Sequence, residues 1–333
     1  MILKKQKNPI GGYFELELNS HRNKLDKWGV AYQSARASLY ALIKQKKCER
    51  IWLPKYICGC VIPPIESLDI EILKYDIDLD FRIKSKIPLR DTDLLLYVNY
   101  FGICDLQEEE LISEYTADQI IFDHSQAFYS RPKDVAATIF SPRKFFGLPD
   151  GGFLYTNTVI EDEYEVDTDS IERSKFLLTR LSSGAEAGYN EFKIADESLN
   201  DFYPKKMSTL TRKLLSSVDI DSVKTQRNIN FNYLHSRLKK INELVIPNNI
   251  NAPLCYPLLI RLDGLRDFLI KNKLFIAKYW PDVMESVDSG SVEDILVNNL
   301  LAIPCDQRYQ EKDMNDIIDL IFIGINEIKH NNI

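Results

Sequence analysis

The chain has 333 residues, of which 45% are apolar, so it is long and apolar enough for a large core and two domains and is not a disordered protein. A net charge of −7 argues against general affinity for nucleic acid. The basic segment 1–7 is followed by no apolar signal region, and the apolar run 317–325 is too short to span a bilayer. We therefore expect a soluble, cytoplasmic protein with no membrane partner.

Six cysteines are present, and their spacing differs from the paired Cys-x-x-Cys pattern with partner histidines that zinc sites use. The closest two, Cys58 and Cys60, also lack the Cys-x-x-Cys spacing of disulfide exchange. We expect no metal site and interpret these two thiols as reduced packing residues.

Helix-like and strand-like segments alternate over the first half of the chain, which is typical of an α/β fold. Ser34 is positioned to cap a helix that runs to Lys47. Continuous apolar runs follow, and such runs suit parallel strands buried on both faces. The predicted strands are 50–54, 71–75, 93–100, 119–123, 135–141 and 152–156, with a helix start at 62–67.

The second half begins with a long helical stretch, predicted from Ser208 to Lys240. After the turn-rich segment 247–251 the chain restarts, with a predicted strand at 254–262 and predicted helices at 265–271, 292–301 and 312–328. We interpret residues 1–240 as a large domain and residues 241–333 as a smaller C-terminal domain.

A carboxylate and a lysine follow two consecutive predicted strands. Asp123 ends the strand 119–123, at the kind of edge where open α/β sheets bind ligands, and Lys144 follows the strand 135–141. This arrangement is typical of a pyridoxal phosphate (PLP) site, in which the lysine holds the aldehyde as a Schiff base and the acid keeps the pyridine nitrogen protonated. Phe145 and Phe146 would desolvate a buried Lys144 and favour its neutral amine.

Simpler interpretations of each residue stay open. Asp123 alone fits a helix cap or a surface carboxylate, and Lys144 alone fits a solvated charge. Residues 149–151 make a good β-turn signature. The small residues that open the helix at Ser34 offer N–H groups and a positive dipole end to a phosphate, and Arg36 adds a charge, although an ordinary capped helix has the same sequence features.

Together these motifs resemble the DegT/DnrJ/StrS aminotransferases, PLP enzymes of fold type I that act mostly on keto-sugar nucleotides. Residues 123–127 are similar to the family's Asp-x-Ala-Gln/His motif. Residues 144–152 resemble its Schiff-base lysine followed by Gly-Gly, and residues 188–192 resemble its Gly-x-Asn-aromatic motif. Weaker similarities lie at 34–39, 53–58, 99–105 and 303–305.

The resemblance implies an α/β fold with a mostly parallel central sheet in the large domain and a smaller α+β C-terminal domain. It implies that Lys144 and Asp123 are catalytic and that Gln126 orients the ring. It also implies a homodimer with shared active sites, because Asn190 would reach the cofactor phosphate of the neighbouring subunit. The implied cofactor-binding residues are Ser34, Ala35, Arg36, Tyr56, Cys58, Asp123, Gln126, Ser141, Lys144 and Asn190.

The implied reaction moves an amino group from glutamate or glutamine to a keto-sugar, which is nucleotide-linked in most relatives of this kind, in deoxyaminosugar or surface polysaccharide biosynthesis. The chain departs from the family pattern at Ala35-Arg36 and at Ser141, which lies unusually close to the lysine. It also departs near Cys58, where many members stack an aromatic side chain on the ring. Here Tyr56 or Phe101 would be the stacking residue. Two alternatives follow: a PLP-dependent sugar dehydratase, although such relatives carry histidine in place of the lysine, and a catalytically degenerate regulator or scaffold.

Overall fold

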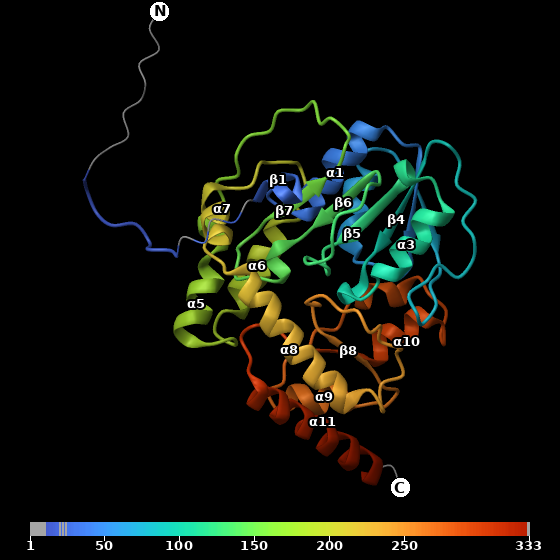
Figure 1. Cartoon of the computed structure of the whole chain (residues 1–333), viewed down its shortest axis with the longest axis vertical. Coiled ribbons are helices and arrows are strands. Elements are labelled where there is room, and N and C mark those ends of the chain that lie inside the picture. The colour runs from blue at the N-terminus through green and yellow to red at the C-terminus, as the bar shows by residue number, and fades with distance from the viewer. Residues whose placement is uncertain (1–10, 20, 22, 24, 332–333) are drawn as a thin grey trace, which may run out of the picture.

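A seven-stranded sheet lies at the centre of the larger part of the molecule (Figure 1). The computed structural model describes residues 11–19, 21, 23 and 25–331. The strand order is β1-β7-β6-β5-β4-β2-β3. The strands are β1 (Val30–Tyr32), β2 (Arg50–Pro54), β3 (Glu71–Tyr75), β4 (Asp93–Val98), β5 (Ile120–His124), β6 (Ala137–Phe140) and β7 (Gly152–Tyr155).

The direction of the strands brings most of their carboxyl ends to one edge. The strands from β6 to β3 are mutually parallel, whereas β7 is antiparallel to both β6 and β1. Strand β1 therefore runs in the same direction as β6. The prediction of an α/β fold with a mostly parallel sheet is confirmed.

Both faces of this sheet are buried, which explains the continuous apolar runs of its strands. Successive side chains point to opposite faces, so on β7 Phe153 belongs to one hydrophobic cluster and Leu154 to the other. Helix α1 (Ala35–Lys46) packs on β6 and β7 on the side of Leu154. On the side of Phe153, Leu215 of α7 (Thr209–Ser216) joins the second cluster.

The predicted caps and helix ends are mostly confirmed. Ser34 caps α1, because its Oγ accepts a hydrogen bond of 3.1 Å from the N–H of Ala37. The short helix α2 (Ile62–Glu66) follows β2, as predicted. The helices that the sequence did not indicate are α3 (Asp105–Glu114), α4 (Ser170–Arg173), α5 (Lys175–Ser183) and α6 (Tyr189–Ser198).

The prediction of one long helix over 208–240 is wrong, because the chain breaks into α7 and α8 (Ile220–Leu238). The break has a local cause: Asp219 caps α8, its side chain accepting a 2.9 Å hydrogen bond from the N–H of Ser222. A capping carboxylate at this point competes with continuation of the preceding helix.

The C-terminal part is a two-stranded antiparallel sheet with three helices, drawn in orange and red in Figure 1. Its elements are β8 (Tyr256–Leu259), α9 (Leu265–Lys271), α10 (Val292–Asn299), β9 (Leu300–Ile303) and α11 (Glu311–Asn331). The predicted helix 292–301 ends earlier than expected, because the buried residues from Leu300 onward pair with β8. Helix α11 packs against α8 and α9.

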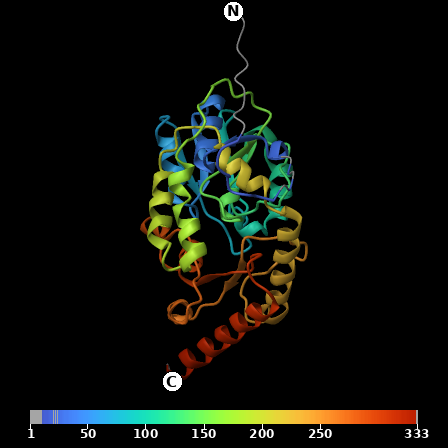
Figure 2. The same ribbon diagram turned by 90° about the vertical axis from the view of Figure 1, so that its left-hand side faces the viewer.

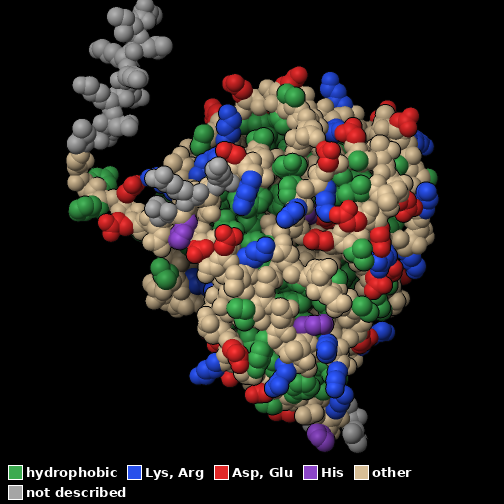
Figure 3. All heavy atoms as spheres, in the orientation of Figure 1, with side chains coloured by type: hydrophobic (Ala, Val, Ile, Leu, Met, Phe, Trp, Pro, Cys, Tyr) green, Lys and Arg blue, Asp and Glu red, His purple; other side chains and the backbone are tan. Residues whose placement is uncertain are grey.

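Hydrogen bonds tie this C-terminal part to segments that follow the strands of the large sheet. The N–H of Ile77 donates to Glu293 Oε1 at 3.0 Å, and Gln307 Nε2 donates to the carbonyl of Phe145 at 2.9 Å, directly after Lys144. Charged side chains of both signs are interspersed over the face shown in Figure 3. Among the helices of the described residues, none is at once long and apolar enough to cross a membrane.

Candidate active site

The structure brings Asp123 and Lys144 to the same edge of the sheet. Asp123 lies on β5, opposite Ile139 of the parallel strand β6. Lys144 ends a single 3-10 turn, Pro142–Lys144, that follows β6 directly. Parallel neighbours have their carboxyl ends at a common edge, so the two side chains follow adjacent strand ends, as the sequence predicted.

The two groups differ in their surroundings. Asp123 is half-buried, and its Oδ1 accepts a 2.8 Å hydrogen bond from the N–H of Ser125. Lys144 is exposed, and among the described residues its Nζ has no hydrogen-bond or ion-pair partner. Phe145 and Phe146 could desolvate the lysine only if it were buried, and this condition is not met: Lys144 is exposed, and both rings are buried in the second cluster against Phe128.

Gln126 is fully buried beside this edge, and within the described residues only one end of its side-chain amide has a hydrogen-bond partner. Its Oε1 accepts a 2.9 Å hydrogen bond from the N–H of Phe101, whereas its Nε2 is buried without a partner in the described structure. A buried donor without an acceptor is costly, so the site lacks an acceptor at this point. The hydroxyl oxygen of a bound pyridine ring is such an acceptor.

His124, at the end of β5, and Glu108 form a buried pair that no sequence pattern indicated. His124 Nε2 lies 2.6 Å from Glu108 Oε1, and both side chains are fully buried. Asn99 Nδ2 donates to the same glutamate oxygen at 2.9 Å and to Asp105 Oδ1 at 2.8 Å. These contacts join α3 to the strand that carries Asp123, which fixes the position of the carboxylate.

The N-terminus of α1 opens at the same edge. Helix geometry leaves the N–H groups of Ala35 and Arg36 without an intrahelical acceptor, so they are available to an anion. Gly152 permits this arrangement: a Cβ at this position would lie 2.2 Å from the backbone carbon of Ser34. Gly151 has a φ of +118° and donates its N–H to the carbonyl of Gln33 at 2.7 Å. The segment after Lys144 is thus fastened to the start of α1.

Two arginines at the site share one carboxylate on α6. Arg36 Nη1 donates to Asn200 Oδ1 at 2.6 Å, and its Nη2 lies 3.7 Å from Asp196 Oδ1. Arg143 donates to the same Asp196 oxygen. The guanidinium of Arg36 is therefore held by Asn200 and by Asp196 of α6, so α1 offers its backbone N–H groups rather than this side chain to a phosphate.

The three candidates for the ring-stacking position lie differently. Tyr56 is fully buried, with its ring centroid 5.6 Å from that of Tyr100 and 4.7 Å from that of Trp280, so it belongs to the core. Phe101 is also fully buried. Cys58 is half-buried after β2, and the pKa of its thiol is lowered first by the hydrogen bond with Cys60 and then by the charges of Lys144 and Arg36. Cys58, not Tyr56, therefore faces the candidate site.

The remaining predicted residues lie at its margins. Ser141 is buried, and its carbonyl accepts the N–H of Lys144 at 3.2 Å. Asn190 is exposed near the start of α6 and, within the described chain, makes no side-chain hydrogen bond to the other candidates. Figure 2 shows α5 and α6 side by side on one flank of the molecule.

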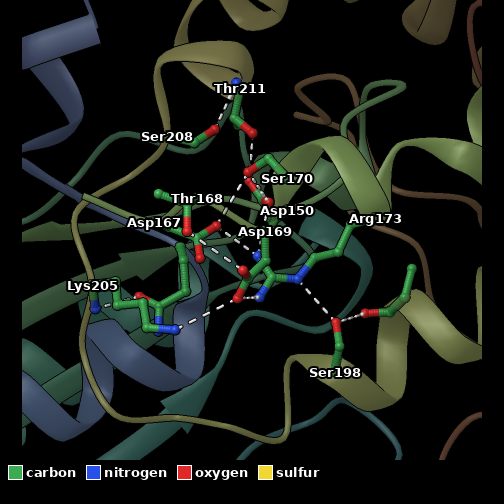
Figure 4. A network of polar contacts seen from close by, with 12 residues as sticks. Asp150, Asp167, Thr168, Asp169, Ser170, Arg173, Ser198, Lys205, Ser208 and Thr211 are labelled. Carbon is green, nitrogen blue, oxygen red and sulfur yellow. Dashed lines mark hydrogen bonds and ion pairs between the residues drawn. The ribbon is translucent and has the colours of Figure 1, made fainter. Parts of the chain in front are cut away.

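A buried polar network anchors the far end of the lysine segment (Figure 4). Asp150 is fully buried and accepts hydrogen bonds from Ser170 and Thr211, and its Oδ2 lies 3.2 Å from Arg173 Nη1. Arg173 Nη1 also donates to Asp167 at 2.6 Å. Burial raises the pKa of Asp150 above its ordinary value, against the opposing effect of these partners. Asp150, part of the β-turn signature at 149–151, thus joins the start of β7 to α4 and α7.

Compared as a sequence, the chain matches no family model and no curated protein. Its structure is similar to a DegT DnrJ EryC1 StrS aminotransferase from Brucella abortus, with 16% identity and a TM-score of 0.60 over 88% of this chain and 84% of that chain. It is also similar to the sugar aminotransferase CalS13 from Micromonospora echinospora, with 14% identity and a TM-score of 0.59 over 88% and 86% of the two chains.

A third similar structure is GDP-4-keto-6-deoxy-D-mannose-3-dehydratase from E. coli with bound hydrated PLP. It is 14% identical, with a TM-score of 0.60 over 88% of this chain and 87% of that chain. These similarities confirm the predicted type I fold, and they confirm the resemblance to the DegT/DnrJ/StrS aminotransferases at the level of the fold.

Proposed function

We propose that this protein is a PLP-dependent aminotransferase that moves an amino group from glutamate or glutamine to a keto-sugar, in nucleotide-linked form. The observation that carries the proposal is the position of Asp123 and Lys144 after adjacent parallel strands, at the edge where α1 begins. Aminotransferases and a PLP-binding dehydratase share the fold, which supports the cofactor class.

The residues at this edge fit PLP group by group. The Asp123 carboxylate suits a protonated pyridine nitrogen, the Lys144 amine suits an aldehyde, and the unpaired Gln126 Nε2 suits the ring oxygen. The N–H groups of Ala35 and Arg36, capped by Ser34, suit a phosphate. When bound, PLP supplies an electron sink that stabilises negative charge at the carbon that loses a proton.

Each of three side chains would have a separate role in the reaction. Lys144 Nζ would hold the cofactor aldehyde and would move a proton at the substrate carbon. Asp123 would keep the ring nitrogen charged, and the N–H of Ser125 fixes one of its two carboxylate oxygens. Gln126 would contact the ring oxygen through its unpaired Nε2.

The proposal includes a homodimer in which Asn190 completes the partner's site. Helices α5 and α6 expose an unusual number of large apolar side chains, which favours burial against a second copy. These side chains are Leu178, Leu181, Tyr189, Phe192 and Ile194. Asn190 lies among them and is free to reach across such an interface.

The alternatives predict different chemistry. A dehydratase shares the fold, but the presence of Lys144 favours amino transfer. A regulator or scaffold would need neither an accessible lysine amine nor an unpaired donor beside it. We place the reaction in the cytoplasm, in deoxyaminosugar or surface polysaccharide biosynthesis.

The test follows the amino nitrogen. The protein is reconstituted with PLP and incubated with glutamate or glutamine that carries ¹⁵N in its α-amino group, and with a panel of nucleotide-linked and free keto-sugars. We expect ¹⁵N in an aminosugar product, one 2-oxo acid per transfer, and no product from a Lys144→Ala protein. Loss of a sugar hydroxyl without nitrogen transfer would identify a dehydratase, and failure to bind PLP would favour the scaffold.

A further inference from the structure

Two free thiols meet at the carboxyl end of β2. The Sγ atoms of Cys58 and Cys60 are 2.9 Å apart, and both side chains are half-buried. The other free cysteines, Cys48, Cys104, Cys255 and Cys305, are buried. The two sulfur atoms are not bonded in this structure, and the thiols contact each other as well as the surrounding core.

The local backbone accounts for this contact. Cys58 is extended, with φ −63° and ψ 126°, and precedes a 3-10 turn over Gly59–Val61. The N–H of Val61 donates to the carbonyl of Cys58 at 3.1 Å and closes the turn. A Cβ on Gly59 would lie 2.4 Å from Asp282 Oδ2, so the turn passes beneath a side chain of the C-terminal part.

The surroundings make the two thiols unequal. The hydrogen bond between the two thiols lowers the pKa of Cys58, and the positive charges of Lys144 and Arg36 lower it further, against the effect of burial. The same contact raises the pKa of Cys60. Burial raises the pKa of Cys48 to about 11 and raises that of Cys104, Cys255 and Cys305. Among these cysteines the surroundings therefore favour the thiolate form most at Cys58, and thiolates are the reactive form.

We propose that Cys58 and Cys60 form a redox-active dithiol at the edge of the candidate site, which hydrogen peroxide oxidises to a disulfide. The Cys58 sulfur attacks one peroxide oxygen, the O–O bond breaks, and the leaving hydroxide takes a proton to become water. Cys60 then loses its proton and attacks the Cys58 sulfur. An S–S bond forms, the S–O bond breaks, and a second water leaves.

In sum, two thiols lose two protons and two electrons, and one peroxide becomes two waters. The product lacks the negative charge that faced Lys144. This inference does not depend on the proposed aminotransferase activity, because it uses only the chain's own sulfur atoms and charges. It does make the candidate site sensitive to oxidants.

The experiment uses the full-length, reduced protein. It is treated with limiting hydrogen peroxide, denatured, alkylated with iodoacetamide and digested with trypsin. Both thiols lie in one peptide, Tyr56–Lys74, which has no internal lysine or arginine. We expect the oxidised peptide to be lighter by two hydrogens and to resist alkylation. Its rate of oxidation should be at least about tenfold higher than that of the peptides with the buried cysteines. Dithiothreitol should reverse the change.

Two variants define the roles. In Cys60→Ser, Cys58 should stop at the sulfenic acid and be trapped by dimedone, because no second thiol resolves it. In Cys58→Ser, Cys60 should stay alkylatable at the same peroxide exposure. The wild-type measurement needs neither variant: a Tyr56–Lys74 peptide that remains doubly alkylated when the buried cysteines are already oxidised would overturn the proposal.

Discussion

The backbone N–H of Phe101 donates a 2.9 Å hydrogen bond to Gln126 Oε1 and leaves the other end of that amide, Nε2, buried and unpaired. Phe101 makes this contact from a left-handed conformation, with φ 57°, that costs a non-glycine residue about 1 kcal/mol. The strained residue Phe101 therefore determines that Gln126 presents Nε2, and not Oε1, to the candidate site. This relationship connects the end of β4 to the residues that follow β5.

Substituting Gln126→Glu should weaken PLP binding. The variant keeps an oxygen for Phe101 but replaces the Nε2 donor with a second acceptor, which repels the ring oxygen. We expect a Kd for PLP about tenfold higher, equal to about 1.4 kcal/mol, measured by fluorescence titration.

The matched control is Gln107→Glu, which removes another buried amide donor, one that bonds the carbonyl of Asp80 at 2.6 Å. It should lower the thermal stability and leave the Kd unchanged. Equal PLP affinity of the Gln126→Glu protein and the wild type would contradict the role assigned to Nε2.

The network around Asp150 should dominate the stability of the lysine segment. Asp150→Ala removes a hydrogen-bond or ion-pair partner from three buried side chains, those of Ser170, Arg173 and Thr211. We therefore expect the free energy of unfolding to fall by about 3 kcal/mol. Asp169→Ala is the control, because Asp169 pairs with the same arginine at 3.5 Å but is 55% exposed. It should cost within about 0.5 kcal/mol by denaturant titration. Similar losses from both substitutions would show that burial is not what matters.

Alkylation of Cys58 should depend on pH in a defined direction. Because its pKa is lowered by the Cys60 contact and by nearby positive charge, the thiolate persists below the ordinary thiol value of about 8.5. The rate of iodoacetamide labelling should reach half its maximum below that pH in the wild type. In Cys60→Ser and in Lys144→Met the midpoint should move upward. A wild-type midpoint at or above about 8.5 would contradict the assignment.

The apolar surface of α5 and α6 should carry the dimer. Leu181 is 86% exposed, and Leu181→Arg should shift the protein toward the monomer in sedimentation experiments. Val245→Arg is the control, since Val245 is 79% exposed but lies outside these helices. A dimer that both variants leave intact would place the interface elsewhere.

Complementation tests whether the site is shared. Lys144→Ala and Asn190→Ala subunits should each be inactive alone. A mixture refolded together should regain amino transfer, because the mixed dimer has one site with both native residues. No recovery from mixed dimers that are shown to form would contradict a contribution of Asn190 to the partner's site.

Much of the large sheet could be predicted because its signals are local. Runs such as 94–98 are apolar throughout, and buried parallel strands need that pattern. The Ser34 cap was predictable for the same reason, since capping depends on residues three positions apart. The order of Asp123 and Lys144 along the chain was enough to place both at one edge, because consecutive parallel strands usually lie side by side.

What the sequence could not supply depends on contacts between distant residues. Asp196 joins Arg36 and Arg143 across more than fifty positions, and Glu108 meets His124 only because α3 packs behind β5. The burial of Phe145 and Phe146 away from an exposed Lys144 likewise follows from the second cluster, which assembles residues from 28 to 220. Short polar motifs contain no information about such partners.

The covalent bond at Lys144 tests the central claim most directly. The protein is incubated with PLP, reduced with borohydride, digested, and searched by mass spectrometry for a lysine that carries the cofactor. The account predicts one modified lysine, Lys144, in the wild type and in the control Lys84→Ala, which removes another exposed lysine, and none in Lys144→Ala. Stoichiometric modification at a different lysine, or no modification of a folded protein that has been saturated with PLP, would contradict it.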